Sequence, residues 1–233
     1  MPQTHSHHPE PYAERPPVGL FLVPAHRRDT PLIDPAAWHG LDPQRLAWLI
    51  RHYTHDGDLV ADLDNHPTVT GAAQYLHRYP ATITTHGERI RVTDDPPARA
   101  RRLAEDGLAL LLAGLPRPGD DSLAMHDTAE AMHLWHRLLR PGGFVLVALP
   151  ARAPEPGRIS RRSTVINAAR IAGLRYHQHI PVLVVPLPAH DPRTDAATAA
   201  SAPPALLDGR HLHTHMDVLA FTATTLDQED TDA

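Results

Sequence analysis

The sequence contains no cysteine, and this absence removes several kinds of chemistry. Without a thiol, the chain has no disulfide framework, no thiolate metal site and no cysteine nucleophile. Lysine is absent as well, so the 22 basic residues other than histidine are all arginine. This bias, together with abundant Ala, Pro and Asp, is typical of a GC-rich genome. A GC-rich histidine codon explains part of the 19 histidines, so their number alone is weak evidence of a site.

Long apolar segments are also lacking. The longest runs, Leu108 to Leu112 and Val182 to Val185, are too short to cross a bilayer, and the first residues lack a charged-then-apolar leader. The formal net charge of −5 argues against a protein that coats nucleic acid by bulk electrostatics, although a local arginine cluster could still contact phosphate. We therefore expect a soluble, cytoplasmic protein with no membrane partner.

The length of 233 residues suits one α/β core with short tails. Residues 1–17 are rich in His, Pro and Glu and show no apolar periodicity, so we expect a disordered tail there. A second disordered tail is expected at residues 225–233. The folded domain is predicted to span residues 18–224, with a Pro-, Ala- and Asp-rich loop insertion at 186–209.

Apolar periodicity between these tails predicts strands that alternate with helices. Helices are predicted at 43–53, with Asp42 as N-cap, and at 68–78, 97–105, 122–139 and 163–172. Strands are predicted at 58–62, 81–85, 90–93, 108–112, 144–149, 174–185 and 213–222. The two final strands have no helix between them. This order predicts a three-layer α/β sandwich whose mostly parallel sheet has an antiparallel final strand.

Four segments resemble one enzyme family. The most specific is Leu134 to Val147, which reads LWHRLLRPGGFVLV and is similar to the helix, turn and fifth strand of Rossmann-like S-adenosylmethionine-dependent methyltransferases. Tyr53 to Asp62, Ala172 to Tyr176 and His215 to Phe221 resemble segments of the bacterial DNA methylases within that family. The resemblance covers roughly Asp42 to Thr222, at weak identity. It implies a Rossmann-like fold and S-adenosylmethionine as the cofactor.

The resemblance places the cofactor loop directly after the first strand and assigns cofactor binding to Asp62, Asp64 and Asn65. In the family this loop holds several glycines, which let the backbone approach the cofactor. Here no glycine precedes Gly71. Proline and β-branched residues stiffen the segment instead. We expect residues 63–70 to occupy, rather than line, the cofactor space, with the side chains of His66 and Thr68 inside it.

The same resemblance places the acceptor loop after the fourth strand, at Gly114, Leu115 and Pro116. Methylases of exocyclic amines carry a polar residue there, followed by Pro-Pro and an aromatic ring that stacks on a flipped base. This chain has neither the polar residue nor the ring, so no catalytic residue is assigned. A helix between the second and third strands is also missing.

These departures predict a pseudoenzyme: a methyltransferase fold in which catalysis is weak or lost and which acts as a binding or scaffold module. The alternative is an active S-adenosylmethionine-dependent nucleic-acid methyltransferase with divergent motifs. Core packing can be retained separately from a catalytic site, so the fold alone does not decide between them.

Histidines alternate near the carboxyl terminus. His211, His213 and His215 would share one face of a strand, and His177 and His179 could lie beside them on the neighbouring strand. Imidazole ligands of this kind can bind zinc or nickel. The composition explains the same residues as solvent-facing histidines, so no metal is predicted and the question stays open.

An arginine cluster follows the fifth strand. Arg158, Arg161 and Arg162 would lie near the carboxyl edge of the sheet, where ligands of open α/β folds bind. The cluster is a candidate contact for nucleic-acid phosphate, and the alternative is a solubilising loop.

Overall fold

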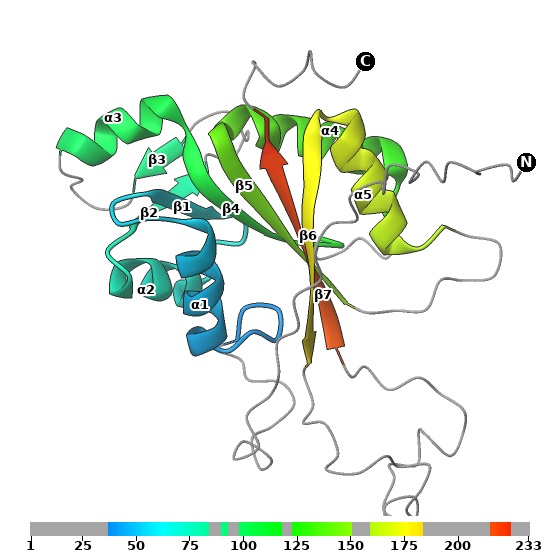
Figure 1. The fold of residues 1–233 in the computed structure, drawn as a ribbon, viewed down its shortest axis with the longest axis horizontal. Helices are drawn as coiled ribbons and strands as arrows, with labels where there is room; N and C mark the ends of the chain where they lie inside the picture. Colours follow the sequence, from blue (N-terminus) through cyan, green and yellow to red (C-terminus); the bar gives the residue numbers. More distant parts are fainter. Residues whose placement is uncertain are drawn as a thin grey trace, which may run out of the picture.

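The fold was obtained as a computed structural model, which describes residues 37–83, 90–92, 98–117, 123–150, 159–183 and 215–224 (Figure 1). The predicted tails at 1–17 and 225–233 and the predicted insertion at 186–209 lie outside these residues.

A seven-stranded sheet forms the centre of the molecule, with the strand order β3-β2-β1-β4-β5-β7-β6. β1, β2, β4 and β5 run parallel to one another, and β3 is antiparallel to β2. β7 is antiparallel to both β5 and β6, as predicted for the final strand. The strands are β1 Leu59–Asp62, β2 Tyr79–Ile83, β3 Ile90–Val92, β4 Leu108–Gly114, β5 Leu139–Pro150, β6 Leu174–Leu183 and β7 His215–Ala223.

Helices cover both faces of this sheet, which makes the predicted Rossmann-like three-layer sandwich (Figure 1). α1 (Pro43–Tyr53) and α2 (Pro67–Tyr75) pack on one face. α3 (Ala98–Asp106), α4 (Met125–Leu138) and α5 (Arg161–Ile171) pack on the other. β4 is buried along its whole length because its side chains alternate between the two cores. Such two-sided burial is what its continuous apolar run predicts.

Helix ends follow the local sequence. The Asp42 carboxylate accepts hydrogen bonds from the backbone N–H groups of Gln44 and Arg45, at 3.0 and 3.1 Å, and Pro43 opens α1. This is the predicted N-cap with proline in the first turn. α5 ends before Gly173, which has a φ of +80° that glycine adopts without strain.

The junction between α4 and β5 differs from the prediction. We expected the helix to reach Leu139 and the strand to begin at Phe144, but β5 begins at Leu139, immediately after the helix. Leu108 pairs with Leu139, and Leu110 pairs with Phe144, so β5 holds extra residues at this point. The Pro-Gly-Gly sequence forms that bulge. A side chain on Gly143 would lie 2.6 Å from the Leu108 carbonyl oxygen, so the close strand contact requires glycine.

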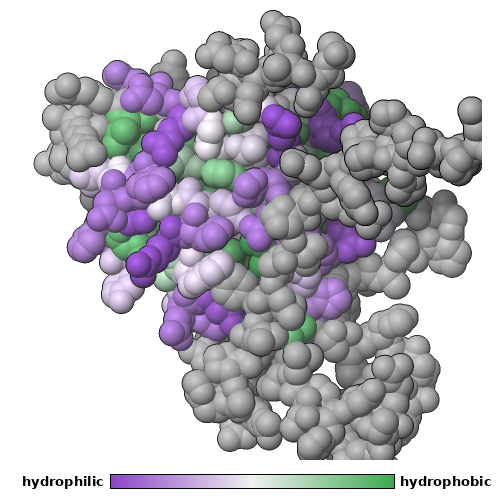
Figure 2. Space-filling view, in the orientation of Figure 1, coloured by the Kyte–Doolittle hydropathy of each residue, from purple (hydrophilic) through white to green (hydrophobic). Residues whose placement is uncertain are grey.

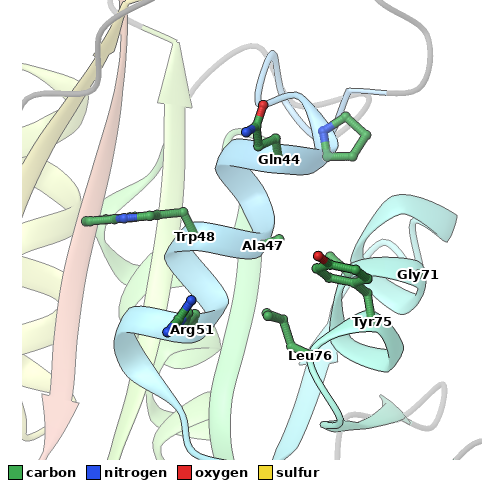
Figure 3. A pocket seen from close by; sticks show the side chains of 9 residues that line it. Gln44, Ala47, Trp48, Arg51, Gly71, Tyr75 and Leu76 are labelled. Carbon is green, nitrogen blue, oxygen red and sulfur yellow. The ribbon is translucent and has the colours of Figure 1, made fainter.

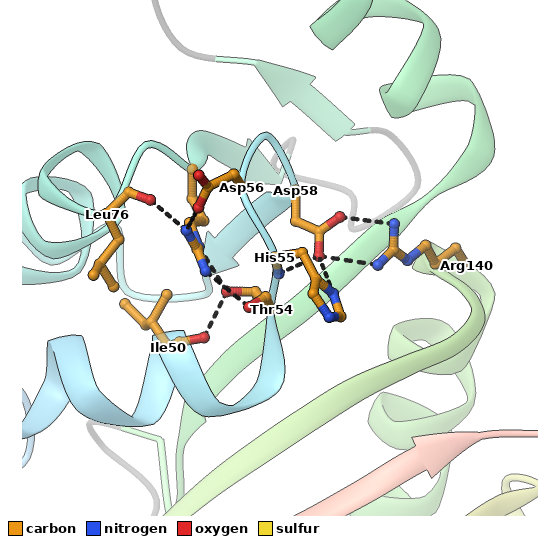
Figure 4. Close-up of polar contacts among 8 residues, drawn as sticks. Ile50, Thr54, His55, Asp56, Asp58, Leu76 and Arg140 are labelled. Carbon is orange, nitrogen blue, oxygen red and sulfur yellow. Dashed lines mark hydrogen bonds and ion pairs between the residues drawn. The ribbon is translucent and has the colours of Figure 1, made fainter.

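Ion pairs and hydrogen bonds join the segments at the amino edge of the sheet (Figure 4). The carboxylate of Asp58 binds the guanidinium of Arg140 through both oxygens, at 2.8 and 3.0 Å. Arg78 is buried and donates to the hydroxyl and carbonyl of Thr54 at 3.0 and 2.8 Å, and it also contacts Asp56. These contacts fix the turns before β1 and before β2, and so they set the position of β1 relative to β5.

The surface of the described residues carries both hydrophilic and apolar side chains. On the face in Figure 2, hydrophilic residues surround small, separate apolar patches. None of the helices in the described ranges is long and apolar enough to span a membrane.

Candidate functional site

The carboxyl ends of β1 and β4 lie side by side, with Asp62 paired to Leu112. The chain leaves β1 toward β2 on one side and later returns as β4 on the other. Ligands of open α/β sheets bind at such a switch point. The sheet therefore brings together the predicted cofactor residues after β1 and the predicted acceptor loop after β4.

Asp62 is buried at the end of β1. Its Oδ1 accepts a hydrogen bond from Trp38 Nε1 at 3.1 Å, and its Oδ2 accepts one from the His66 backbone N–H at 2.7 Å. Burial raises the pKa of this carboxyl above its ordinary value, against the two hydrogen bonds, which lower it. Both oxygens of the predicted cofactor residue are thus already bound to groups of the chain itself.

Asp64 lies between two basic side chains from distant segments. Its Oδ2 is 3.1 Å from His39 Nε2, and its Oδ1 is 2.6 Å from Arg117 Nη1. The Arg117 contact is an ion pair without hydrogen-bond geometry, and Nη1 is buried. The next residue, Asn65, is exposed and has a φ of +50°, in the left-handed region that asparagine tolerates. The Asp64 carboxylate therefore joins the loop after β1 to the loop after β4.

His39 lies against the end of β4. A Cβ built on Gly114 would come within 2.0 Å of two atoms of the His39 ring, so the imidazole occupies the space directly above this glycine. His39 sits in a turn closed by a bridge between Trp38 and Leu41, with φ values of +47° at His39 and +84° at Gly40. The turn packs into the sheet because the Trp38 side chain is fully buried.

We name the group Trp38, His39, Asp62, Asp64 and Arg117 the carboxyl-edge cluster. Its two aspartates are predicted from the sequence, and the other three members are not. Arg117 follows the predicted acceptor loop directly and could have been included on that ground. The turn at Trp38 has only a weak local signal, a glycine shortly before the N-cap of α1.

The segment after β1 was predicted to place the side chains of His66 and Thr68 in the cofactor space, with a helix from Thr68. The helix, α2, begins at Pro67, one residue earlier. His66 is its N-cap, with Nδ1 accepting from the Thr68 N–H at 3.3 Å. The place of these two side chains relative to a cofactor stays a prediction. Proline is well suited to a first helical position, which shortens the loop. The side chain that lies against the Gly114 end of β4 is His39.

The predicted acceptor loop continues from β4 with Gly114, Leu115 and Pro116. Leu115 is buried in the core beside α4 and α5, and its N–H donates to the Ala148 carbonyl at 2.9 Å. The Leu115–Pro116 peptide bond is cis. The loop supplies backbone and apolar groups, and the nearest charged side chain along the chain is Arg117. No catalytic residue is assigned here.

The histidines of the last two strands fall into two groups. His179 Nε2 is 2.7 Å from Asp217 Oδ1, and His215 Nε2 is 3.9 Å from the same oxygen. His177 lies apart in a bulge and contacts the rings of Tyr53 and Phe144. Burial, and then the nearby His52, lower the pKa of His177.

Among the described residues, no group of three or more His, Asp or Glu side chains is arranged to hold a metal ion. The predicted ligands His211 and His213 lie outside those residues. The arginine cluster is also described only in part. Arg161 and Arg162 are the first residues of α5, after its N-cap Ser160, whereas Arg158 lies outside the described residues. Phosphate binding by this cluster stays a prediction.

No protein-family model and no curated protein sequence matches this chain. Solved structures do match its fold. Geranyl diphosphate C-methyltransferase from Streptomyces coelicolor A3(2), in complex with Mg²⁺, geranyl diphosphate and S-adenosyl-L-homocysteine, aligns with a TM-score of 0.50 and 14% identity, covering 88% of this chain and 90% of that one. A TehB-like methyltransferase from Corynebacterium glutamicum aligns with a TM-score of 0.43 and 14% identity, covering 77% and 87%. The fold is that of Rossmann-like methyltransferases, and at these identities the likeness shows the fold alone.

Proposed function

We propose that this chain is a cytoplasmic methyltransferase-fold protein whose cofactor site is closed by its own side chains. In this proposal catalysis is weak or lost, and the protein acts as a binding or scaffold module. The observation that supports it is the His39 imidazole directly above Gly114, held there by Asp64.

S-adenosylmethionine is the candidate cofactor, because an enzyme with this fold holds S-adenosyl-L-homocysteine. A cofactor at a switch point needs close backbone approach, which glycine permits. Gly114 could offer that approach, but the His39 ring fills the space above it. Asp62 could offer a carboxylate, but Trp38 and His66 already donate to both its oxygens. The residues therefore fit the cofactor only if His39 moves away.

The second candidate is an active S-adenosylmethionine-dependent methyltransferase with divergent motifs. One observation favours it: 37% of the His39 side chain is exposed and the residue lies on a turn, so the ring can rotate into solvent at small cost. The acceptor class is open within this candidate. A relation to DNA methylases would point to nucleic acid, and the geranyl diphosphate enzyme has the same fold with a small-molecule ligand.

Calorimetric titration with S-adenosyl-L-homocysteine tests the proposal on the full chain. We expect no binding to the unmodified protein at about 1 mM ligand and measurable binding after His39→Ala, which opens the space above Gly114. His126→Ala is the matched control, because His126 is an exposed histidine on α4, far from the site in sequence. Binding to the unmodified protein at micromolar ligand, with methyl transfer abolished by Asp62→Ala, would establish the second candidate instead.

A further inference from the structure

A pocket of about 440 Å³ lies between the outer faces of α1 and α2 (Figure 3). Ala47, Ala72 and Leu76 form part of its apolar lining, and the aromatic side chains of Trp48 and Tyr75 come from the two different helices. The volume falls in the range of small-molecule sites, roughly 300–1,000 Å³. The pocket shares no residue with the carboxyl-edge cluster.

Its aromatic residues are unusually exposed. Trp48 is 50% exposed and Tyr75 is 78% exposed, whereas the other tryptophans, Trp38 and Trp135, are buried. His52 stacks on the Trp48 indole, with ring centroids 5.1 Å apart and planes 6° from parallel. The indole points away from Tyr75 and lies at the rim of the pocket (Figure 3). Large exposed aromatic side chains beside an apolar depression are typical of binding surfaces.

Arg51 gives the pocket a positive charge. It is exposed and lines the pocket. Arg45, on the same helix, instead contacts the Asp42 carboxylate at 3.3 Å. A guanidinium beside an apolar pocket is suited to the anionic group of a ligand, because it offers paired donors to carboxylate, sulfonate or phosphate oxygens.

Gly71 lines the pocket on its α2 side. A Cβ built on this helical glycine would meet no atom within 4 Å, so the α2 backbone faces free space there. Glycine in a helix costs stability relative to alanine, about 1 kcal/mol. An open glycine at this position leaves room for a ligand ring beside Tyr75.

We propose that this pocket binds a small planar aromatic anion, with the ring against Tyr75 and the anionic group on the Arg51 guanidinium. This site is separate from the closed cofactor site and adds a ligand that the methyltransferase fold does not imply. The anion can be a carboxylate, a sulfonate or a phosphate, since Arg51 binds each through the same donors.

The test uses the fluorescent anion 8-anilinonaphthalene-1-sulfonate as probe on the full chain, with Trp48 as energy donor. We expect one site with a Kd of roughly 10–100 μM. Arg51→Met should weaken binding about tenfold, and Gly71→Leu, which fills the pocket, should abolish it. Gly71→Ala and Arg170→Met, which replaces an exposed arginine on α5, are the controls that should retain binding. Near-ultraviolet circular dichroism verifies the fold of each variant.

Displacement of the probe by indole-3-carboxylate or by adenosine 5′-monophosphate distinguishes a carboxylate ligand from a phosphate ligand. Undiminished probe binding to Gly71→Leu would overturn the proposal. So would equal affinity for the uncharged N-phenyl-1-naphthylamine, since Arg51 would then have no role. A dimer in sedimentation experiments that Gly71→Leu dissociates would show a protein interface in place of a ligand site.

Discussion

The His39 imidazole and Gly114 are in direct contact, with the ring 2.0 Å from the point where a Cβ of residue 114 would lie. At the other end of β4, Gly107 has a different kind of neighbour. A Cβ there would lie 2.6 Å from the Arg140 backbone nitrogen and 2.8 Å from the Leu139 carbonyl carbon, and the φ of Gly107 is +105°. One glycine thus faces a movable side chain, and the other faces fixed backbone.

Alanine substitutions at these two glycines should therefore differ in cost. We expect Gly114→Ala to cost less than Gly107→Ala in the free energy of unfolding, because the His39 side chain can shift where backbone cannot, whereas Gly107→Ala should cost about 3 kcal/mol or more. Urea unfolding measures both. Equal costs would show that His39 is held as rigidly as backbone, which would strengthen the closed-site proposal and contradict this prediction.

Arg78 should be a major contributor to stability. Arg78→Leu removes the donors to the Thr54 hydroxyl and carbonyl, which are buried, so we expect a loss of about 2–4 kcal/mol in the free energy of unfolding. Asp56→Asn is the control, because the Asp56 side chain is 81% exposed and its pairing with Arg78 should contribute little. Thermal unfolding of the two variants should rank them in this order, and the reverse order would contradict the role assigned to the buried contacts.

Alkaline pH should destabilise the protein through Tyr53. Burial raises the pKa of the Tyr53 phenol to about 12, and its hydroxyl donates to Gln178 at 2.7 Å. Because the folded pKa lies above the unfolded value of about 10, the stabilising contribution of the neutral phenol is complete below pH 10 and is lost as pH rises through 12. We expect a loss of about 2 kcal/mol over this range, which Tyr53→Phe should reduce.

The chain suits this measurement because it has neither cysteine nor lysine. Tyrosines are then the side chains that titrate between about pH 9 and 12. Absorbance at alkaline pH reports their ionisation directly, and urea unfolding at each pH reports stability. An unchanged slope of stability against pH in Tyr53→Phe would assign the effect to another group, such as Tyr176, whose pKa burial also raises.

The stability of the Asp62→Asn variant, relative to the unmodified chain, should increase as pH rises. The folded pKa of this carboxyl is raised by burial, so its contribution to stability is complete below the unfolded pKa of about 3.9 and is lost as pH rises through the folded value. Asparagine has no such loss. The melting temperature of the variant relative to the unmodified chain should therefore be higher at neutral pH than at about pH 3. Asp106→Asn, at an exposed carboxyl, is the control. A melting temperature of Asp62→Asn that falls relative to the unmodified chain as pH rises would contradict the prediction.

Local sequence determined the elements of this fold. The apolar run from Leu108 predicts a strand buried on both faces, and Asp42-Pro43 predicts the start of α1, because these signals act within a few residues. The absence of a helix before the last strand predicts its antiparallel course. Alternation of strands and helices also places Asp62, Asp64 and Gly114 at one sheet edge, since parallel strands end at the same edge.

Only the tertiary structure decided what fills that edge. His39 and Arg117 meet Asp64 from segments 25 and 53 residues away by number, and no local pattern encodes such a contact. No local pattern encodes the hydrogen bond from Trp38 to Asp62 either. The pocket between α1 and α2 likewise forms only where the two helices pack beside each other on the sheet. Periodicity specifies which face of an element is buried. Which side chains meet across elements depends on how all of them pack together.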